Sequence, residues 1–273
     1  NGGLVLEKKD SADSYFSYRV AGNYQLYPEH TLRVAFNRSF RSPTLLESQQ
    51  EQLVRYNENI ILDASVISDG EINNERLRSI EVGYLGYLLD RKLSFDMRLF
   101  REQLTDVINE RRSGYPDFDN FVNIRDNTDT FNVNGFEIQT QYRPNDRFLL
   151  RTHYSYSDID GETIHTSPPE LEIRELGIHS LKHGAGFLVS YGFDRGITLS
   201  SMASYRSATK HYRGSNVGSH TRIDLKASRR WTIINSNIDL SLLVQNVGEP
   251  YREFYNYNQF DTQYVLGLKV SMP

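Results

Sequence analysis

Hydrophobic and polar residues alternate with a period of two along most of this chain. Between Tyr15 and Leu26, for example, Phe16 and Val20 share one face, while Ser17 and Arg19 share the other. A period of two places successive side chains on opposite faces of a β-strand. The same alternation recurs in 31–37, 93–99, 136–143, 150–156, 222–227, 238–245 and 263–270. We predict about eleven strands of roughly nine to twelve residues, the length a tilted strand needs to cross a bilayer.

The polar face of these strands is charged. Arg33, Asp96, Glu137, Arg151 and Asp239 all fall on it. Burying many ionised groups in a dry core would cost several kcal/mol each unless all were paired. This face must therefore be wet, or must pack on a polar plug.

Short and long connections alternate strictly between the strands. Tight turns are expected at 27–30, 89–92, 144–147, 194–196 and 234–236, and long loops at Arg41–Leu77, Val107–Asn132, Asp158–Lys182, Arg206–His220 and Gly248–Asp261. Outer-membrane barrels have short periplasmic turns and long extracellular loops. The alternation of hydrophobic and polar residues, taken alone, equally fits a soluble antiparallel sheet with one solvated face. The strand lengths, the aromatic residues near strand ends and the asymmetric connections favour an all-β, antiparallel, up-and-down transmembrane β-barrel.

Composition removes several other classes of protein. The mean hydropathy is −0.57 and no apolar run is long enough for a transmembrane helix. The chain has no cysteine, which excludes a disulfide framework and thiolate metal sites. Its net charge of −4 argues against nucleic-acid binding. No linker divides the 273 residues, so we expect one architectural unit, and the absence of a signal peptide at Asn1 indicates a mature protein or a fragment.

Four stretches carry a family resemblance. They are Leu32–Glu47 (LRVAFNRSFRSPTLLE), Asn74–Tyr84 (NERLRSIEVGY), Asn134–Gln139 (NGFEIQ) and Ile238–Tyr251 (IDLSLLVQNVGEPY). In this order they resemble the C-terminal half of the barrel of the TonB-dependent outer-membrane receptors. Two details depart from the family pattern: Asn73 and Asn74 precede Glu75 where a proline is usual, and the chain stops at Pro273 rather than at an aromatic residue.

The resemblance implies a twenty-two-stranded barrel closed around an N-terminal plug. Residues 1–273 would supply about eleven C-terminal strands, without the plug, the TonB box or the first barrel half. The implied partners are those missing parts of the same receptor, TonB, and the lipid and lipopolysaccharide of the bacterial outer membrane. An open half-barrel exposes unpaired strand edges, so we expect the segment not to be a stable membrane protein alone.

The long loops contain the candidate ligand-binding residues. These are Arg111, Arg112, Tyr115, Tyr212, Arg213, Tyr251, Arg252, Tyr255 and Tyr257. Arginine forks and tyrosine rings suit an anionic, aromatic iron chelate, although water-facing loops are often polar and aromatic without any ligand. The resemblance implies uptake of a scarce ligand, most often a ferric siderophore, with cobalamin, haem or a glycan open. The alternative is a passive outer-membrane porin or adhesin.

No enzyme, cofactor or resident metal is expected. A nucleophile, base and orienting group do not occur together, so the sequence offers no catalytic residues. Glu81, Asp96, Glu137, Asp224 and Asp239 alternate with arginines and predict an ion-pair lattice instead. His165, His179 and His183 fall in one long loop, but most isolated histidines are structural or solvated.

Overall fold

A computed structural model of the chain describes residues 2–7, 15–57, 60–68, 71–114, 121–167, 170–175, 180–210, 216–233, 236–253 and 258–271. Side chains are described within these ranges except at 6–7, 55–57, 60–65, 111–114, 121, 162–167 and 170–175. Within the described ranges, no helix is long and apolar enough to cross a membrane.

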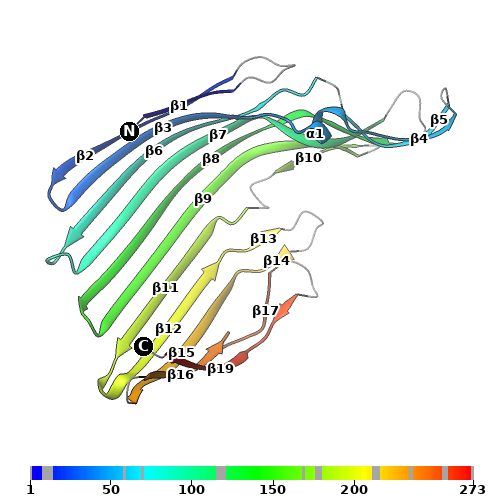
Figure 1. Cartoon of the computed structure of the whole chain (residues 1–273). Helices are drawn as coiled ribbons and strands as arrows, with labels where there is room; N and C mark the ends of the chain where they lie inside the picture. Colours follow the sequence, from blue (N-terminus) through cyan, green and yellow to red (C-terminus); the bar gives the residue numbers. More distant parts are fainter. Residues whose placement is uncertain are drawn as a thin grey trace.

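One curved antiparallel sheet dominates the structure (Figure 1). Its path runs β1, β2, β3, β6, β7, β8, β9, β11, β12, β15, β16, β19, so neighbours in the chain are neighbours in the sheet. The bounds are β1 Gly2–Glu7, β2 Tyr15–Tyr27, β3 His30–Arg41, β6 Glu75–Leu88, β7 Leu93–Gly114, β8 Phe121–Asn145, β9 Phe148–Ser167, β11 His183–Gly192, β12 Ile197–Arg206, β15 His220–Ile233, β16 Ser236–Gln245 and β19 Gln263–Ser271.

This topology confirms the predicted all-β, antiparallel, up-and-down fold. The eleven predicted strands correspond to β2 through β19 of the path, and β1 is a strand that the prediction missed. The tight turns at 27–30, 89–92, 144–147 and 194–196 are also confirmed, since each joins two neighbours of the path. Residues 234 and 235 of the fifth predicted turn lie outside the described residues. The turn at 194–196 is a single 3₁₀ turn, η2 (Asp194–Gly196), with Arg195 and Gly196 at positive φ.

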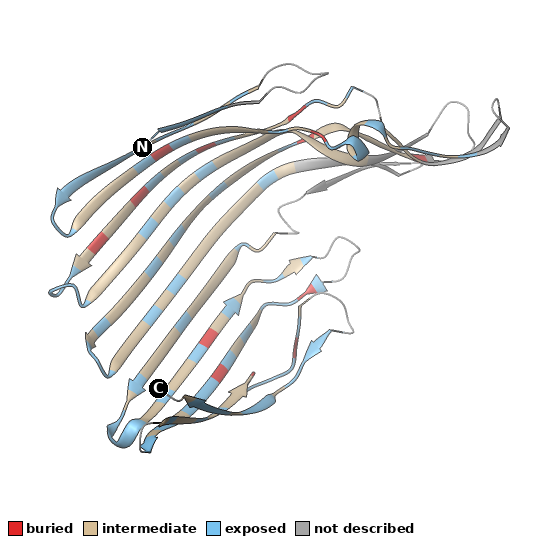
Figure 2. Ribbon diagram, in the orientation of Figure 1, coloured by how far each residue is buried: buried red, intermediate tan, exposed pale blue. Residues whose placement is uncertain are grey.

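The two faces of the sheet differ as the alternation predicts. On β7, Met97 and Leu99 are 40% and 60% exposed, and on β19 Leu266 and Leu268 are 73% and 69% exposed. Figure 2 shows few buried positions anywhere along the strands. Large apolar side chains therefore form an exposed face, as they would against hydrocarbon, and not a packed core.

The long loops contain strands and a helix that the sequence analysis did not predict. Residues 107–114 and 121–132 continue β7 and β8 as a two-stranded ribbon. At about 3.3 Å per residue, the 22 residues of β7 span roughly 70 Å, more than twice a hydrocarbon core of about 30 Å. Beyond the membrane both faces of such a ribbon meet water, so the apolar alternation that marks a strand is lost.

The other long connections also contain short elements. Between β3 and β6 lie helix α1 (Leu45–Gln49) and the strands β4 (Glu51–Asn57) and β5 (Ile60–Ser68). The later connections contain β10 Glu170–Glu175, β13 Thr209–Lys210, β14 Asn216–Val217, β17 Tyr251–Arg252 and β18 Gln259–Phe260. Strand β5 pairs in parallel with β8, which ties the connection after β3 to the ribbon of β7 and β8.

Candidate functional site

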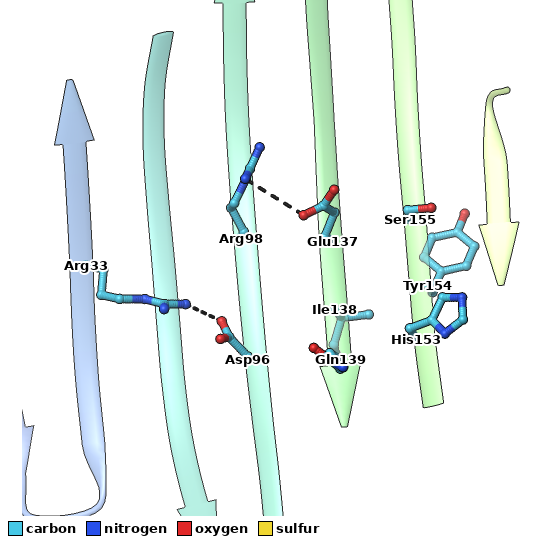
Figure 3. A pocket seen from close by; sticks show the side chains of 9 residues that line it. All are labelled: Arg33, Asp96, Arg98, Glu137, Ile138, Gln139, His153, Tyr154 and Ser155. Atoms are coloured by element: carbon cyan, nitrogen blue, oxygen red, sulfur yellow. Dashed lines mark hydrogen bonds and ion pairs between the residues drawn. The ribbon is translucent and has the colours of Figure 1, made fainter. Parts of the chain in front are cut away.

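An ion pair on the polar face joins strands that are not neighbours (Figure 3). Arg33 on β3 pairs with Asp96 on β7, so its side chain crosses the intervening strand β6. Gly83 on β6 is the direct partner of Arg33 in the register. A Cβ at Gly83 would lie 3.1 Å from Arg33 Nε. The glycine therefore leaves the path open along which the arginine reaches its carboxylate.

A second arginine continues this lattice across β7 and β8. Arg98 lies 3.8 Å from carboxylate oxygens of both Glu102 and Glu137, and its guanidinium lies 4.6 Å from the ring centroid of Phe100. Arg98 and Glu137, together with Arg33, Asp96, Gln139 and His153, line a hollow of about 490 Å³. The predicted ion-pair lattice is present for Asp96 and Glu137, and Asp224 and Asp239 pair with Arg222 and Arg230.

Helix α1 is fixed to the long-loop end of β3 by a charged cluster. Thr44 caps the helix: its hydroxyl accepts a hydrogen bond from the Glu47 backbone N–H, and its own N–H donates to the Glu47 carboxylate at 2.8 Å. Arg41 donates two hydrogen bonds of 3.0 Å to that carboxylate and also pairs with Glu75. The hydrogen bonds from Arg41, with those from Thr44, lower the pKa of Glu47 to about 2.

Arg125 connects this helix to the ribbon of β7 and β8. Its guanidinium donates to the Leu46 carbonyl at 3.2 Å and to Gln50 Oε1 at 2.8 Å, and it pairs with Glu110 on β7. The Ser68 hydroxyl, at the end of β5, donates to the Glu47 carbonyl at 2.7 Å. Helix, hairpin and ribbon thus form one connected unit at the long-loop end of the sheet.

Asn246 follows the last residue of β16, the strand next to the edge strand β19. It adopts a positive φ of 55° and is 3% exposed. Its backbone N–H donates to Asp224 at 2.9 Å, its side-chain amide donates to the Phe260 carbonyl at 3.0 Å, and its carbonyl accepts from the Thr262 hydroxyl at 2.7 Å. Asn246 therefore lies at the end of β16, and its hydrogen bonds with Phe260 and Thr262 tie together the two ends of the connection between β16 and β19.

Tyr251 packs beside this residue in a stack of rings. Its ring centroid lies 4.3 Å from that of His220 and 5.2 Å from that of Phe260, with interplanar angles of 16° and 17°. It is 7% exposed. Burial among carbons lowers the pKa of His220, which favours the neutral imidazole in the stack.

A larger hollow opens at the long-loop end of β9, β11 and β12. Its volume is about 1090 Å³, and its charged lining consists of Asp158, Asp160, Lys182, His183 and Lys210. Lys182 Nζ lies 2.8 Å from Asp158, and the hydrogen bond to this carboxylate raises the pKa of the lysine. The hollow therefore offers a polar surface with charges of both signs.

A comparison with protein families decides what this sheet belongs to. The family described as "TonB dependent receptor-like, beta-barrel" matches residues 1–247. The chain belongs to the TonB-dependent receptors. Receptors of this family are outer-membrane proteins and not enzymes, so the expected localisation is confirmed and the passive porin or adhesin is disfavoured. No curated protein matches the chain.

Solved structures show the same fold at low sequence identity. The siderophore receptor PiuA from Acinetobacter baumannii matches with a TM-score of 0.63 and 17% identity, over 96% of this chain and 37% of that chain. The FrpB iron transporter from Neisseria meningitidis (F3-3 variant) matches with a TM-score of 0.67 and 14% identity, over 94% and 39%. The siderophore receptor PirA from Pseudomonas aeruginosa matches with 0.68 and 12%, over 99% and 45%. The chain thus spans less than half the length of these receptors.

The structure of the receptor segment places only some of the predicted ligand-binding residues. Arg111 and Arg112 lie on the β7 extension, where only the backbone is described. Tyr251 is buried in its stack, and Arg252 beside it is exposed. Tyr115, Tyr212, Arg213, Tyr255 and Tyr257 fall outside the described residues. Their role in ligand binding stays a prediction.

Sequence reasoning missed the residues that line the larger hollow. The sequence predicted Asp158 and Lys182 as the two ends of one long loop. It did not predict that their side chains form an ion pair. Among the described residues, no group of three or more metal-binding side chains comes together. His183 instead accepts or donates a 2.8 Å hydrogen bond with the Tyr154 hydroxyl, His165 is described by its backbone alone, and His179 lies outside the described residues.

Proposed function

We propose that this chain forms part of the barrel wall of a receptor that takes up a ferric siderophore through the outer membrane. The observation that carries the proposal is the hollow of about 1090 Å³ at the long-loop end. Lys182 and Lys210 line it, and Lys210 lies directly before the segment that contains the predicted residues Tyr212 and Arg213. Cationic and aromatic side chains suit an anionic iron chelate.

The solved structures lend support at the level of fold. PiuA and PirA are siderophore receptors and FrpB is an iron transporter by name, and this chain shares their fold at 12% to 17% identity. We propose by the same resemblance that the remaining barrel strands, a plug and TonB act with this wall. Arg111, Arg112, Tyr115, Tyr251, Arg252, Tyr255 and Tyr257 are proposed to contact ligand from the neighbouring connections.

Growth under iron limitation tests the proposal. A strain that lacks the whole receptor is supplied in turn with a ferric catecholate, a ferric hydroxamate, haemin or cyanocobalamin. We expect the restored receptor to support growth on at least one ferric siderophore, and this growth to be lost in a strain without TonB. Growth on haemin alone, rescue only of cobalamin-dependent growth, or growth without TonB would contradict the proposal.

A pair of lysine variants tests the position of the site. Lys182→Gln with Lys210→Gln removes two positive charges from the hollow, while Lys269→Gln removes one on β19, away from it. Binding of the ferric siderophore is measured by quenching of tyrosine and tryptophan fluorescence in the purified receptor. We expect the double variant to bind roughly tenfold more weakly and Lys269→Gln to bind as the parent does. Equal affinities in all three would place the ligand elsewhere.

A further inference from the structure

Three arginines lie together on the apolar face of the sheet, near its long-loop end. Arg38, Arg78 and Arg101 belong to the neighbouring strands β3, β6 and β7. Arg38 and Arg78 are direct partners, and Arg101 pairs with Ile80, two residues along β6 from Arg78. Direct partners have Cβ atoms about 5 Å apart, and diagonal neighbours are about 7 to 8 Å apart. We call these three residues the arginine cluster, and its guanidinium groups can meet on one ligand.

The arginine cluster faces the same side as the exposed apolar residues. Side chains two positions apart share a face of a strand. Each arginine lies two positions from the last exposed apolar residue at the long-loop end of its strand, these being Phe36, Ile80 and Leu99, which are 47%, 42% and 60% exposed. The cluster is therefore the first polar row beyond the exposed apolar residues on three strands in succession, and on β3 the half-buried Phe40 follows it.

No carboxylate neutralises the cluster within the described part of the chain. Asp106 lies nearby on β7, but it pairs with Arg76 at 2.8 Å. The guanidinium of Arg38 lies 4.9 Å from the ring centroid of Phe40, and its shielded Nε has no hydrogen-bond partner among the described residues. Arg78 and Arg101 are exposed. Three cations placed side by side repel one another, so an anion between them would be stabilised.

Two other strands of the sheet have no arginine at this level of the face. At the corresponding positions, two residues beyond Phe136 on β8 and beyond Ile223 on β15, the residues are Asn134 and Thr221. At the opposite end of the same face, Arg229 lies 5.0 Å from the ring centroid of Trp231.

We propose that the arginine cluster binds the phosphate groups of lipopolysaccharide in the outer leaflet of the outer membrane. Long loops of an outer-membrane barrel face the cell exterior. The row just beyond the apolar face at that end therefore lies at the level of the outer-leaflet headgroups. Arginine forks match phosphate oxygens in two-point hydrogen bonds. This proposal rests on the membrane orientation of the family and not on the identity of the transported ligand.

Lipopolysaccharide retained by the whole receptor measures this interaction. The receptor is extracted from outer membranes in mild detergent, and bound lipopolysaccharide is quantified by native mass spectrometry. We expect R38Q/R78Q/R101Q to retain roughly tenfold less than the parent, and R38K/R78K/R101K to retain an intermediate amount. Arg229→Gln, on the same face at the tight-turn end, is the matched control and should retain the parental amount.

Nanodiscs distinguish the source of the phosphate. We expect binding to discs that contain lipopolysaccharide to depend on the arginine cluster. Equal dependence in discs of phosphatidylglycerol, or displacement by millimolar inorganic phosphate, would overturn the assignment to lipopolysaccharide. Parental retention in R38Q/R78Q/R101Q would overturn the site itself. Heat-modifiable mobility on a gel reports folding; if the triple variant does not fold, parental retention in all three single glutamine variants rejects the site.

Discussion

Neutralising Glu47 should loosen helix α1 without removing its cap. Glutamine at this position can still accept the backbone hydrogen bond from Thr44, since glutamine also serves in a capping box. Glu47→Gln removes the negative charge that accepts two hydrogen bonds from Arg41. The variant therefore isolates the ion pair from the cap.

The magnitude follows from the pKa of Glu47. The hydrogen bonds from Arg41 and Thr44 lower this pKa from its ordinary value of 4.5 to about 2. At about 1.4 kcal/mol per unit this corresponds to roughly 3 kcal/mol as an upper limit, because Arg41 keeps Glu75 as a partner in the variant. We expect the free energy of local opening of residues 44–50 to fall by about 1 to 3 kcal/mol.

Hydrogen exchange of the receptor, followed by mass spectrometry, measures this opening. The Ser48 amide donates to the Thr44 carbonyl at 3.0 Å and is a direct probe of the helix. Because the folded-state pKa of Glu47 is depressed, its contribution is complete above pH 4.5 and is lost as the pH falls toward about 2. After correction for intrinsic exchange, the parent should lose protection over that interval, and Glu47→Gln should not.

Glu29→Gln is the control, since Glu29 lies in the tight turn at the other end of β3. The reasoning is refuted if Glu47→Gln exchanges like the parent at neutral pH. It is equally refuted if Glu29→Gln loosens residues 44–50 to the same extent.

Three further predictions concern the sheet and its connections. Gly135→Ala should lower the unfolding free energy by about 1 to 3 kcal/mol in urea titrations, because the new Cβ would lie 2.5 Å from the Tyr156 carbonyl oxygen. Gly22→Ala is the control and should change the unfolding free energy by less than about 0.5 kcal/mol, because no atom lies within 4 Å of its new Cβ. Equal effects of the two substitutions would contradict the prediction. Asn246→Ala should reduce hydrogen-exchange protection of residues 258–262 more than Asn246→Gly does, since only alanine adds the cost of about 1 to 2 kcal/mol for positive φ; the opposite order would show that the amide alone matters. Asp158→Asn should lower the pKa of Lys182 toward its ordinary value in NMR titrations of isotopically dimethylated lysines, and an unchanged value would mean that the pair does not form in solution.

The strands that cross the membrane could be predicted from the sequence because lipid and water impose opposite demands on their two faces. Leu93 to Leu99 alternate strictly and lie where β7 begins. The continuation of β7 to Gly114 carries no such signal, since its extension is held by pairing with β8 outside the membrane. β1 was missed because its six residues, Gly2–Glu7, are too few to establish a period.

The sequence predicts that ion pairs form on the polar face, but it does not predict which residues pair. Alternation places Arg33 and Asp96 on one face, yet their contact depends on the register of β3, β6 and β7 together. It also depends on Gly83, which reads in the sequence as an ordinary strand glycine. Register across three strands is a property of the folded sheet and not of any one segment.

The motifs that identify the family are explained by architecture more than by ligand. Arg41 and Glu47 tie a helix to the end of β3, Gly135 lies where the Phe100 ring and the Tyr156 backbone approach, and Asn246 ends β16 at a positive φ. Each occupies a place where the barrel wall needs one particular side chain, or none. Apart from Tyr251, the predicted ligand-binding residues lie outside the four motifs. A receptor can therefore change what it binds there while the wall stays recognisable, which is why this sequence identifies its family more readily than its cargo.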